Sequence, residues 1–148
     1  MSEQKVSVPS GRVQGSCFCG KVLYEADFPS LWVAHCHCAN CRRAQGAGVV
    51  TYAGFKTEQV RFTAGEEGLV SYVDPGTEGL RRFCGSCGST ISFEAPRWAG
   101  ELHLMVANLT SPLDKLPQAH AYSDRAPDWC PVTDDLPRFG GATGSEPL

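Results

Sequence analysis

Seven of the eight cysteines in this 148-residue chain fall into three short clusters. The clusters are Cys17-x-Cys19, Cys36-x-Cys38-x-x-Cys41 and Cys84-x-x-Cys87, while Cys130 stands apart. Because short loops bring two or three sulfurs onto one tetrahedral metal ion, these spacings are typical of zinc ligation. Clusters of two, three and two thiolates predict one closed four-sulfur site and one three-sulfur site with an open fourth position.

The rest of the sequence favours metal over disulfide bonds. The N-terminal segment lacks the apolar core of a secretory signal, and no window approaches the roughly 18 apolar residues of a membrane span. We therefore expect a cytoplasmic protein with no membrane partner, in a compartment that disfavours disulfides. The net charge is −3 and basic residues form no long block, so nucleic acid is not an expected partner.

Composition is typical of a β protein rich in loops. Hydrophobic residues make up 42% of a chain with 16 glycines and 10 prolines, which predicts one domain of short strands. We expect one helical turn, at 39–44. The other predicted elements are antiparallel strands at 21–27, 32–36, 48–52, 59–63, 69–73, 80–84, 90–94, 102–107 and 119–123. Residues 1–14 are predicted to be a lead-in, 15–139 the zinc-binding domain and 140–148 a flexible tail.

The four-sulfur site is predicted to combine Cys17 and Cys19 with Cys84 and Cys87. In an extended strand, residues i and i+2 point to the same face, so both sulfurs of the first pair can share a metal ion. Glycines in the second cluster let backbone N–H groups approach the sulfurs, which stabilises thiolates. A site with no open position has a structural role. Pairing the first cluster with two cysteines of the second is the alternative, and it would divide the compact CxCxxC unit.

Cys36, Cys38 and Cys41 lie within six consecutive residues and form the predicted three-sulfur site. A zinc ion with three protein ligands keeps a position for water or substrate, which is typical of catalytic sites. A histidine or the eighth cysteine could instead close this site; the candidates are His35, His37, His103, His120 and Cys130. Arg42 and Arg43 follow the third cysteine, either to bind a substrate carboxylate or to balance thiolate charge.

Three ordered motifs and a C-terminal pattern carry a family resemblance. The motifs are Gly15-Ser16-Cys17-Phe18-Cys19-Gly20, Cys36-His37-Cys38-Ala39-Asn40-Cys41-Arg42 and Phe83-Cys84-Gly85-Ser86-Cys87-Gly88. The C-terminal pattern is His120, then Pro127-Asp128-Trp129, then Asp134-Asp135-Leu136-Pro137-Arg138-Phe139. From about Gly15 to Phe139 the chain resembles the glutathione-dependent formaldehyde-activating enzyme (GFA) family. Cys130-Pro131 departs from the family's pattern.

This resemblance implies a mainly β fold, a β-tent of small antiparallel sheets, with two zinc ions. The family's structural site matches Cys17, Cys19, Cys84 and Cys87, and its catalytic site matches Cys36, Cys38 and Cys41. The implied activity is a carbon–sulfur lyase that condenses glutathione, or a similar thiol, with formaldehyde or another small aldehyde to an S-hydroxymethyl adduct. Zinc would lower the pKa of the thiol or polarise the carbonyl. The alternative is a non-catalytic, zinc-stabilised module that binds a thiol or a protein, because family likeness fixes fold better than function.

Overall fold

The computed structural model describes residues 11–148, which divide into two compact units. Unit 1 comprises residues 11–31 and 54–114, and unit 2 comprises residues 32–53 and 115–148. Strands predominate in the described chain, which confirms the mainly β fold of small sheets predicted from the sequence. Among residues 11–148, no helix is long and apolar enough to cross a membrane. Residues 1–10, most of the predicted lead-in, lie outside the described residues.

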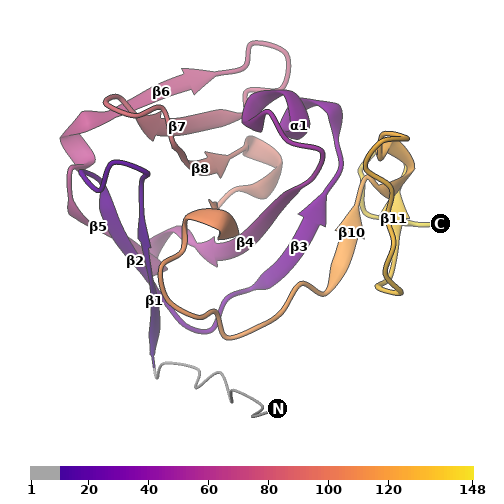
Figure 1. The fold of residues 1–148 in the computed structure, drawn as a ribbon, viewed down its shortest axis with the longest axis horizontal. Helices are drawn as coiled ribbons and strands as arrows, with labels where there is room; N and C mark the ends of the chain where they lie inside the picture. Colours follow the sequence, from indigo (N-terminus) through magenta and orange to yellow (C-terminus); the bar gives the residue numbers. More distant parts are fainter. Residues whose placement is uncertain (1–10) are drawn as a thin grey trace. The chain divides into compact units, whose positions relative to one another are not determined.

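Unit 1 contains a three-stranded antiparallel sheet in the order β1-β2-β5 (Figure 1). Its strands are β1 (Arg12–Ser16), β2 (Leu23–Asp27) and β5 (Val60–Ala64). Because successive side chains of a strand point to opposite faces, Val13, Tyr24 and Ala26 are buried together. The Tyr24 ring lies so close to Gly15 that a Cβ at that position would collide with it. The glycine before the first cysteine motif is therefore required by packing.

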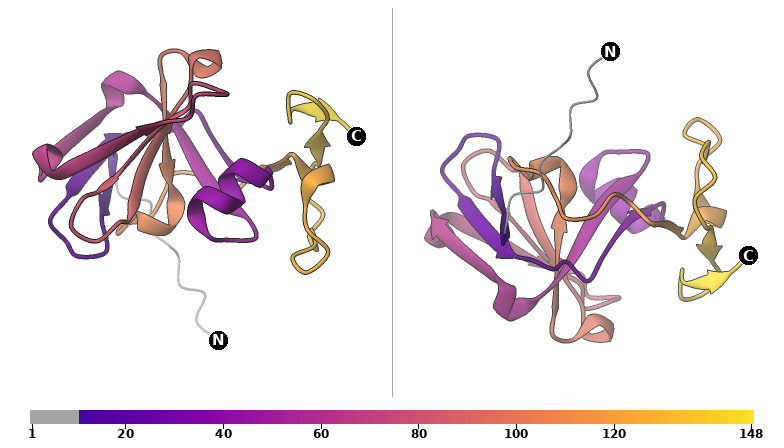
Figure 2. Two further views of the ribbon diagram at one scale, coloured as in Figure 1. Left: turned by 90° about the horizontal axis from the view of Figure 1, so that it is seen from above. Right: turned by 90° about the horizontal axis from the view of Figure 1, so that it is seen from below.

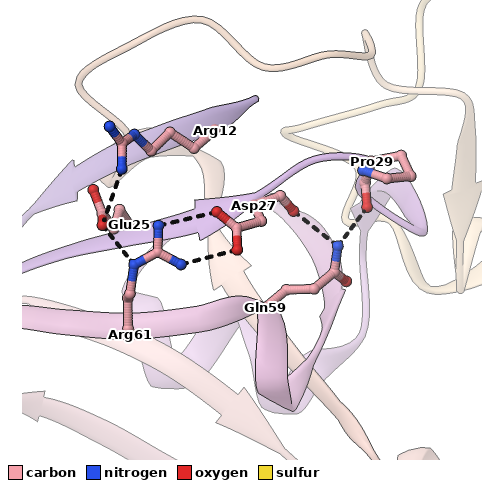
Figure 3. A network of polar contacts seen from close by, with 6 residues as sticks. All are labelled: Arg12, Glu25, Asp27, Pro29, Gln59 and Arg61. Atoms are coloured by element: carbon pink, nitrogen blue, oxygen red, sulfur yellow. Dashed lines mark hydrogen bonds and ion pairs between the residues drawn. The ribbon is translucent and has the colours of Figure 1, made fainter. Parts of the chain in front are cut away.

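The other face of this sheet carries a network of charged side chains (Figure 3). Arg61 donates a 2.6 Å hydrogen bond to Glu25 and two more, of 2.9 and 3.0 Å, to the carboxylate of Asp27. Arg12 lies 3.5 Å from the same Glu25 oxygen. The amide of Gln59 donates to the backbone carbonyl of Asp27. Arg61 holds the pKa of Asp27 below its usual range, so this carboxyl is ionised at neutral pH.

Four further strands of unit 1 form an antiparallel meander in the order β9-β8-β7-β6. They are β6 (Leu69–Val73), β7 (Leu80–Cys84), β8 (Thr90–Glu94) and β9 (Glu101–Met105), and the first three match the predicted bounds. Ile91 on β8 and Leu104 on β9 are fully buried. Short 3-10 turns precede β5, β6 and β9 and follow β9; they are Thr57–Gln59, Glu66–Gly68, Pro96–Trp98 and Val106–Asn108.

Unit 2 is built around β3 (Trp32–Cys36) and β10 (Ala119–Ala121), which pair in parallel. This pairing corrects the expectation of antiparallel strands throughout. The whole of residues 54–114 intervenes between the two parts of unit 2, so no hairpin forces β10 to run against β3. The strand β4 (Val50–Lys56) begins in unit 2 and ends in unit 1.

The helix α1 (Ala39–Gln45) follows β3 directly and confirms the predicted helical turn (Figures 1 and 2). The side chain of Cys38 caps its first turn by accepting a hydrogen bond from the backbone N–H of Cys41. Gly46 ends the helix with a φ of 63°, a conformation that glycine adopts without strain. The only regular helix in the described residues is thus fixed at its start by a cysteine.

The C-terminal residues, which include the predicted tail over 140–148, fold back on themselves (Figure 2, yellow). β11 (Phe139–Gly140) pairs with β12 (Glu146–Pro147) in a short antiparallel ladder. The backbone N–H of Tyr122 also donates to the carbonyl of Gly144, next to the 3-10 turn Ser123–Arg125. Backbone hydrogen bonds thus link this segment both to itself and to the residues around Tyr122.

Candidate metal centres

The four-sulfur group of unit 1 brings together two loops that are far apart in the sequence. All four sulfurs, those of Cys17, Cys19, Cys84 and Cys87, lie within 4.8 Å of one another. The Sγ atoms of Cys17 and Cys19 are 3.6 Å apart, and those of Cys19 and Cys84 are 3.8 Å apart. This is the partition predicted from spacing, and such a group offers a metal ion a complete tetrahedral set of ligands.

The Cys17-x-Cys19 motif is a turn rather than the extended strand expected from its spacing. β1 ends at Ser16, and the backbone N–H of Gly20 donates to the carbonyl of Cys17 at 3.2 Å. Phe18 projects into solvent with 90% of its surface exposed. The backbone N–H of Gly88 donates to the carbonyl of Cys84, four residues earlier, at 2.8 Å, so both cysteine pairs lie on tight turns. A turn brings the sulfurs together more closely than the i, i+2 repeat of a strand would.

The sulfurs of this group differ in acidity. Hydrogen bonding from the backbone of Ser89 lowers the pKa of Cys87 to about 6. The backbone of Lys21 acts to lower the pKa of Cys19, but desolvation and the adjacent sulfurs outweigh it and raise that pKa to about 11. Four thiolates this close repel one another, so the group needs a cation before all of them can ionise.

The three-sulfur group of unit 2, called here the cup, consists of Cys36, Cys38 and Cys41. Cys36 ends β3, Cys38 caps α1 and Cys41 lies in the first turn of that helix. The three sulfurs lie within 4.8 Å of one another, and those of Cys36 and Cys41 are 3.5 Å apart. The hydroxyl of the buried Tyr52 donates to the sulfur of Cys41 at 3.4 Å. One strand end and one helix start thus supply the cup.

The sequence candidates for a fourth ligand do not join the cup. Among residues 11–148, no histidine, cysteine or carboxylate extends the three sulfurs to a group of four. His103 lies in unit 1, 3.3 Å from Glu101. Cys130 packs against Gly48, where an added Cβ would lie 2.6 Å from its sulfur. The described chain therefore leaves the cup with three protein ligands.

The cup resists ionisation unless a cation is bound. The adjacent thiols of Cys38 and Cys41, together with burial, strongly raise the pKa of Cys36. The pKa of Cys38 is also raised, because the effects of Cys41 and burial outweigh a lowering contact with Cys36. A metal ion would stabilise all three thiolates at once, as soft sulfur ligands do for zinc. The donor set therefore fits zinc.

The other three histidine candidates form a cluster that the sequence did not predict, in which His37 and His120 are buried and His35 is half-buried. His37 Nε2 lies 2.8 Å from His120 Nδ1, and His120 Nε2 lies 2.8 Å from the carboxylate of Asp134. His35 stacks on His120 at a ring separation of 4.9 Å and hydrogen-bonds Thr51 at 2.7 Å. Burial, followed by the nearby His120, lowers the pKa of His37 to about 4, so His37 is neutral at pH 7. The only sign of this cluster in the sequence was that His35 and His37 are two residues apart.

Arg42 donates hydrogen bonds to two backbone carbonyls. Its Nε donates to the carbonyl of His37 at 3.0 Å, and its Nη2 to the carbonyl of Arg125 at 3.4 Å. Arg43, one position later on α1, is exposed. Arg42 therefore ties α1 to neighbouring backbone of unit 2, while the structure gives Arg43 no such role.

Comparison with known proteins identifies the family of this chain. A crystal structure of a Rhodobacter sphaeroides protein, a structural-genomics target, matches with a TM-score of 0.57 at 25% identity, over 70% of this chain and 97% of that one. No curated protein is significantly similar to the chain. The family model described as glutathione-dependent formaldehyde-activating enzyme matches residues 12–125, which include all seven clustered cysteines. The chain therefore belongs to the glutathione-dependent formaldehyde-activating enzyme family.

Proposed function

We propose that this protein is a zinc-dependent carbon–sulfur lyase that condenses glutathione, or a similar thiol, with formaldehyde or another small aldehyde. The observation that carries the proposal is the cup, three sulfurs with no fourth protein ligand among residues 11–148. Membership of the family supplies the substrate class. We further propose two zinc ions per chain, a structural one at the four-sulfur group and a catalytic one at the cup, and a cytoplasmic location.

The proposed reaction conserves every atom. The thiol sulfur forms a bond to the aldehyde carbon, and the thiol proton moves to the carbonyl oxygen to give an S-hydroxymethyl product. When bound at the cup, zinc supplies an open coordination position and positive charge, which favours a thiolate or polarises a carbonyl oxygen.

The residues of this chain hold and tune that site. Cys36, Cys38 and Cys41 supply the ligands, fixed by the end of β3 and the start of α1. Three thiolates donate much negative charge, which weakens a metal ion as a Lewis acid. The hydrogen bond from Tyr52 to Cys41 withdraws part of that charge, so Tyr52 favours the proposed chemistry.

Exchange spectroscopy by NMR tests the proposal directly. The rate of exchange between free and glutathione-bound formaldehyde is measured at matched pH with the metal-loaded protein and without it. We expect the protein to accelerate exchange, the Cys38→Ser variant to lose the acceleration while staying folded, and Cys130→Ser to keep it. Cys130 is the matched control because it belongs to neither sulfur group. Full acceleration by a folded Cys38→Ser variant would contradict a catalytic cup.

The alternative, a non-catalytic thiol-binding module, is favoured by the state of the histidines. His35, His37 and His120 are each hydrogen-bonded within unit 2, and His37 and His120 are buried. The module predicts saturable binding of glutathione with no change in the rate of exchange. The same NMR experiment, with glutathione titrated against two-zinc protein, therefore separates a carrier from an enzyme.

A further inference from the structure

His37 lies between two sulfurs of the cup and is held from several directions. Its backbone N–H donates to the carbonyl of Ala121 at 3.0 Å, and its own carbonyl accepts from Arg42 Nε at 3.0 Å. Its ring Nε2 lies 2.8 Å from Nδ1 of His120. The residue between two expected metal ligands is thus attached to both β10 and α1.

His120 is itself fixed by the segment that follows Pro131. Its backbone N–H donates to the carbonyl of Pro137 at 2.9 Å, and its ring Nε2 lies 2.8 Å from Asp134 Oδ1. The backbone N–H of Leu136 donates to the same carboxylate oxygen at 3.0 Å. The imidazole of His120 is 5% exposed and the side chain of Asp134 is 48% exposed. A half-exposed carboxylate therefore anchors a buried ring.

The donors and acceptors in the row His37–His120–Asp134 can be assigned by starting from the carboxylate of Asp134. The contact with His120 lowers the pKa of Asp134, so an ionised carboxylate accepts and His120 Nε2 donates. An imidazole that donates from Nε2 alone accepts at Nδ1, and in that tautomer of His120 the hydrogen bond at Nδ1 comes from His37 Nε2. His37 Nδ1 then carries a lone pair; it is buried and has no hydrogen-bond partner in the described chain. Each ring in the row is thereby fixed in one orientation.

We propose that Asp134 and His120 are positioning residues of the cup. Through His37, they hold the peptide that joins Cys36 to Cys38 and so keep these two sulfurs at the separation that a metal ion needs. The inference rests on the proposed binding of metal at the cup. It extends the site beyond residues 12–125, the range matched by the family model, to a carboxylate near the C-terminus.

Outer residues of this kind act on metal affinity. Groups that hydrogen-bond behind metal ligands fix the orientation of those ligands, and their loss typically lowers metal affinity about 10–100-fold. Here the orienting contact acts on the residue between two ligands rather than on a ligand itself. We therefore expect the effect of Asp134 near the lower end of that range, and that of His120, which contacts His37 directly, to be larger.

Metal release from each site can be followed separately. Protein loaded with cadmium-113 should give one NMR signal per site, and the signal changed by Cys38→Ser identifies the cup. Release of zinc to a chromophoric chelator is then timed for Asp134→Ala, Asp134→Asn and His120→Phe. Asp135→Ala is the matched control, because Asp135 is the exposed neighbour of Asp134. Asparagine keeps an oxygen that can accept a hydrogen bond from His120, so Asp134→Asn should release zinc from the cup at a rate close to that of the wild type.

The expected result is selective. Release from the cup should be about 10-fold faster in Asp134→Ala and up to about 100-fold faster in His120→Phe. The cadmium signal of the cup should shift in both variants, while the four-sulfur site and Asp135→Ala stay unchanged. If His120→Phe does not fold, Asp134→Ala alone decides, because its side chain is half-exposed.

Several results would overturn the positioning role. Unchanged release and signals in Asp134→Ala and a folded His120→Phe would do so, as would equal acceleration at both sites, which indicates general destabilisation. Wild-type protein that binds metal only at the four-sulfur group would overturn both this inference and the proposed function. Selective release from the cup, combined with no acceleration of formaldehyde exchange, would sustain the positioning role and contradict only the lyase.

Discussion

Both sulfur groups are made of cysteine Sγ atoms, but one draws them from distant parts of the chain and the other from a single short segment. The four-sulfur group joins Cys19 to Cys84, residues 65 positions apart, and all its ligands come from two tight turns of unit 1. The cup takes its three ligands from residues 36–41, one strand end and one helix start. Closing a long loop removes more conformational entropy from the unfolded chain than closing a local one. The first group is therefore suited to stabilise the fold, and the cup is suited to chemistry.

The sharpest test of this contrast removes one sulfur from each group. Cys84 is 2% exposed, and serine at this position would leave the proposed structural metal ion with three sulfur ligands. Metal binding at structural zinc sites is worth roughly 10–16 kcal/mol, as much as the whole stability of a typical domain, about 5–15 kcal/mol. We expect Cys84→Ser to prevent folding of unit 1, as measured by circular dichroism melting and metal content. Cys38→Ser should melt close to wild type, and the reverse order would break the comparison.

Substitution of two glycines, one in each unit, compares how tightly the chain packs around the four-sulfur group and around the cup. A Cβ at Gly15 would strike the ring of the buried Tyr24, whereas one at Gly48 would meet Cys130 and the 72% exposed Trp129. Overpacking in a well-packed core costs about 1–3 kcal/mol. We expect Gly15→Ala to lower the free energy of unfolding by that amount and Gly48→Ala by less, because Cys130 is only partly buried and Trp129 is exposed, so both can shift. Urea titration of both variants measures the difference, and equal losses would contradict it.

Local features of this protein could be predicted from sequence. The strands 32–36, 69–73, 80–84 and 90–94 were predicted at their observed bounds, because β-branched and aromatic residues fill them and turn residues bound most of them. The division of the cysteines into groups of four and three also followed from spacing alone.

Features that depend on distant contacts could not be predicted. His103 and His120 look alike in the sequence, each inside a short strand, yet one lies beside Glu101 and the other between His37 and Asp134. The parallel register of β10 with β3, which creates that row, is set by chain that returns after residues 54–114. Likewise, only the bond from Gly20 to Cys17 shows that the first motif is a turn.

Tyr52 offers a subtler test of the cup. Phenylalanine would remove the hydroxyl that donates to Cys41 and keep the buried ring. A hydrogen bond to a charged group contributes roughly 1.5–3 kcal/mol, so we expect Tyr52→Phe to accelerate zinc release from the cup about 10-fold or more. Release from the four-sulfur group should not change. Tyr72→Phe, on the exposed strand β6, is the control, and equal effects of the two variants would remove Tyr52 from the site.

The smallest expected effect concerns the charged face of the β1-β2-β5 sheet. Arg61→Met would remove the hydrogen bonds to Glu25 and Asp27, which are at the surface and screened by solvent (Figure 3). We expect a small decrease in melting temperature at neutral pH, far less than that of Cys84→Ser, because exposed ion pairs contribute little. Thermal melting at low and high salt measures it, with the difference shrinking as salt rises.

The pH dependence of the same variant has a definite sign. Arg61 lowers the folded-state pKa of Asp27 below its ordinary value of 3.8, so the stabilisation is present above about pH 3.8 and is lost as pH falls through the lower folded value. The melting temperatures of Arg61→Met and wild type should therefore converge in acid. A deficit as large as that of Cys84→Ser, or one that persists at pH 2, would mean that surface charge stabilises unit 1 as much as its sulfur group does. The assignment of its stability to the four-sulfur group would then be wrong.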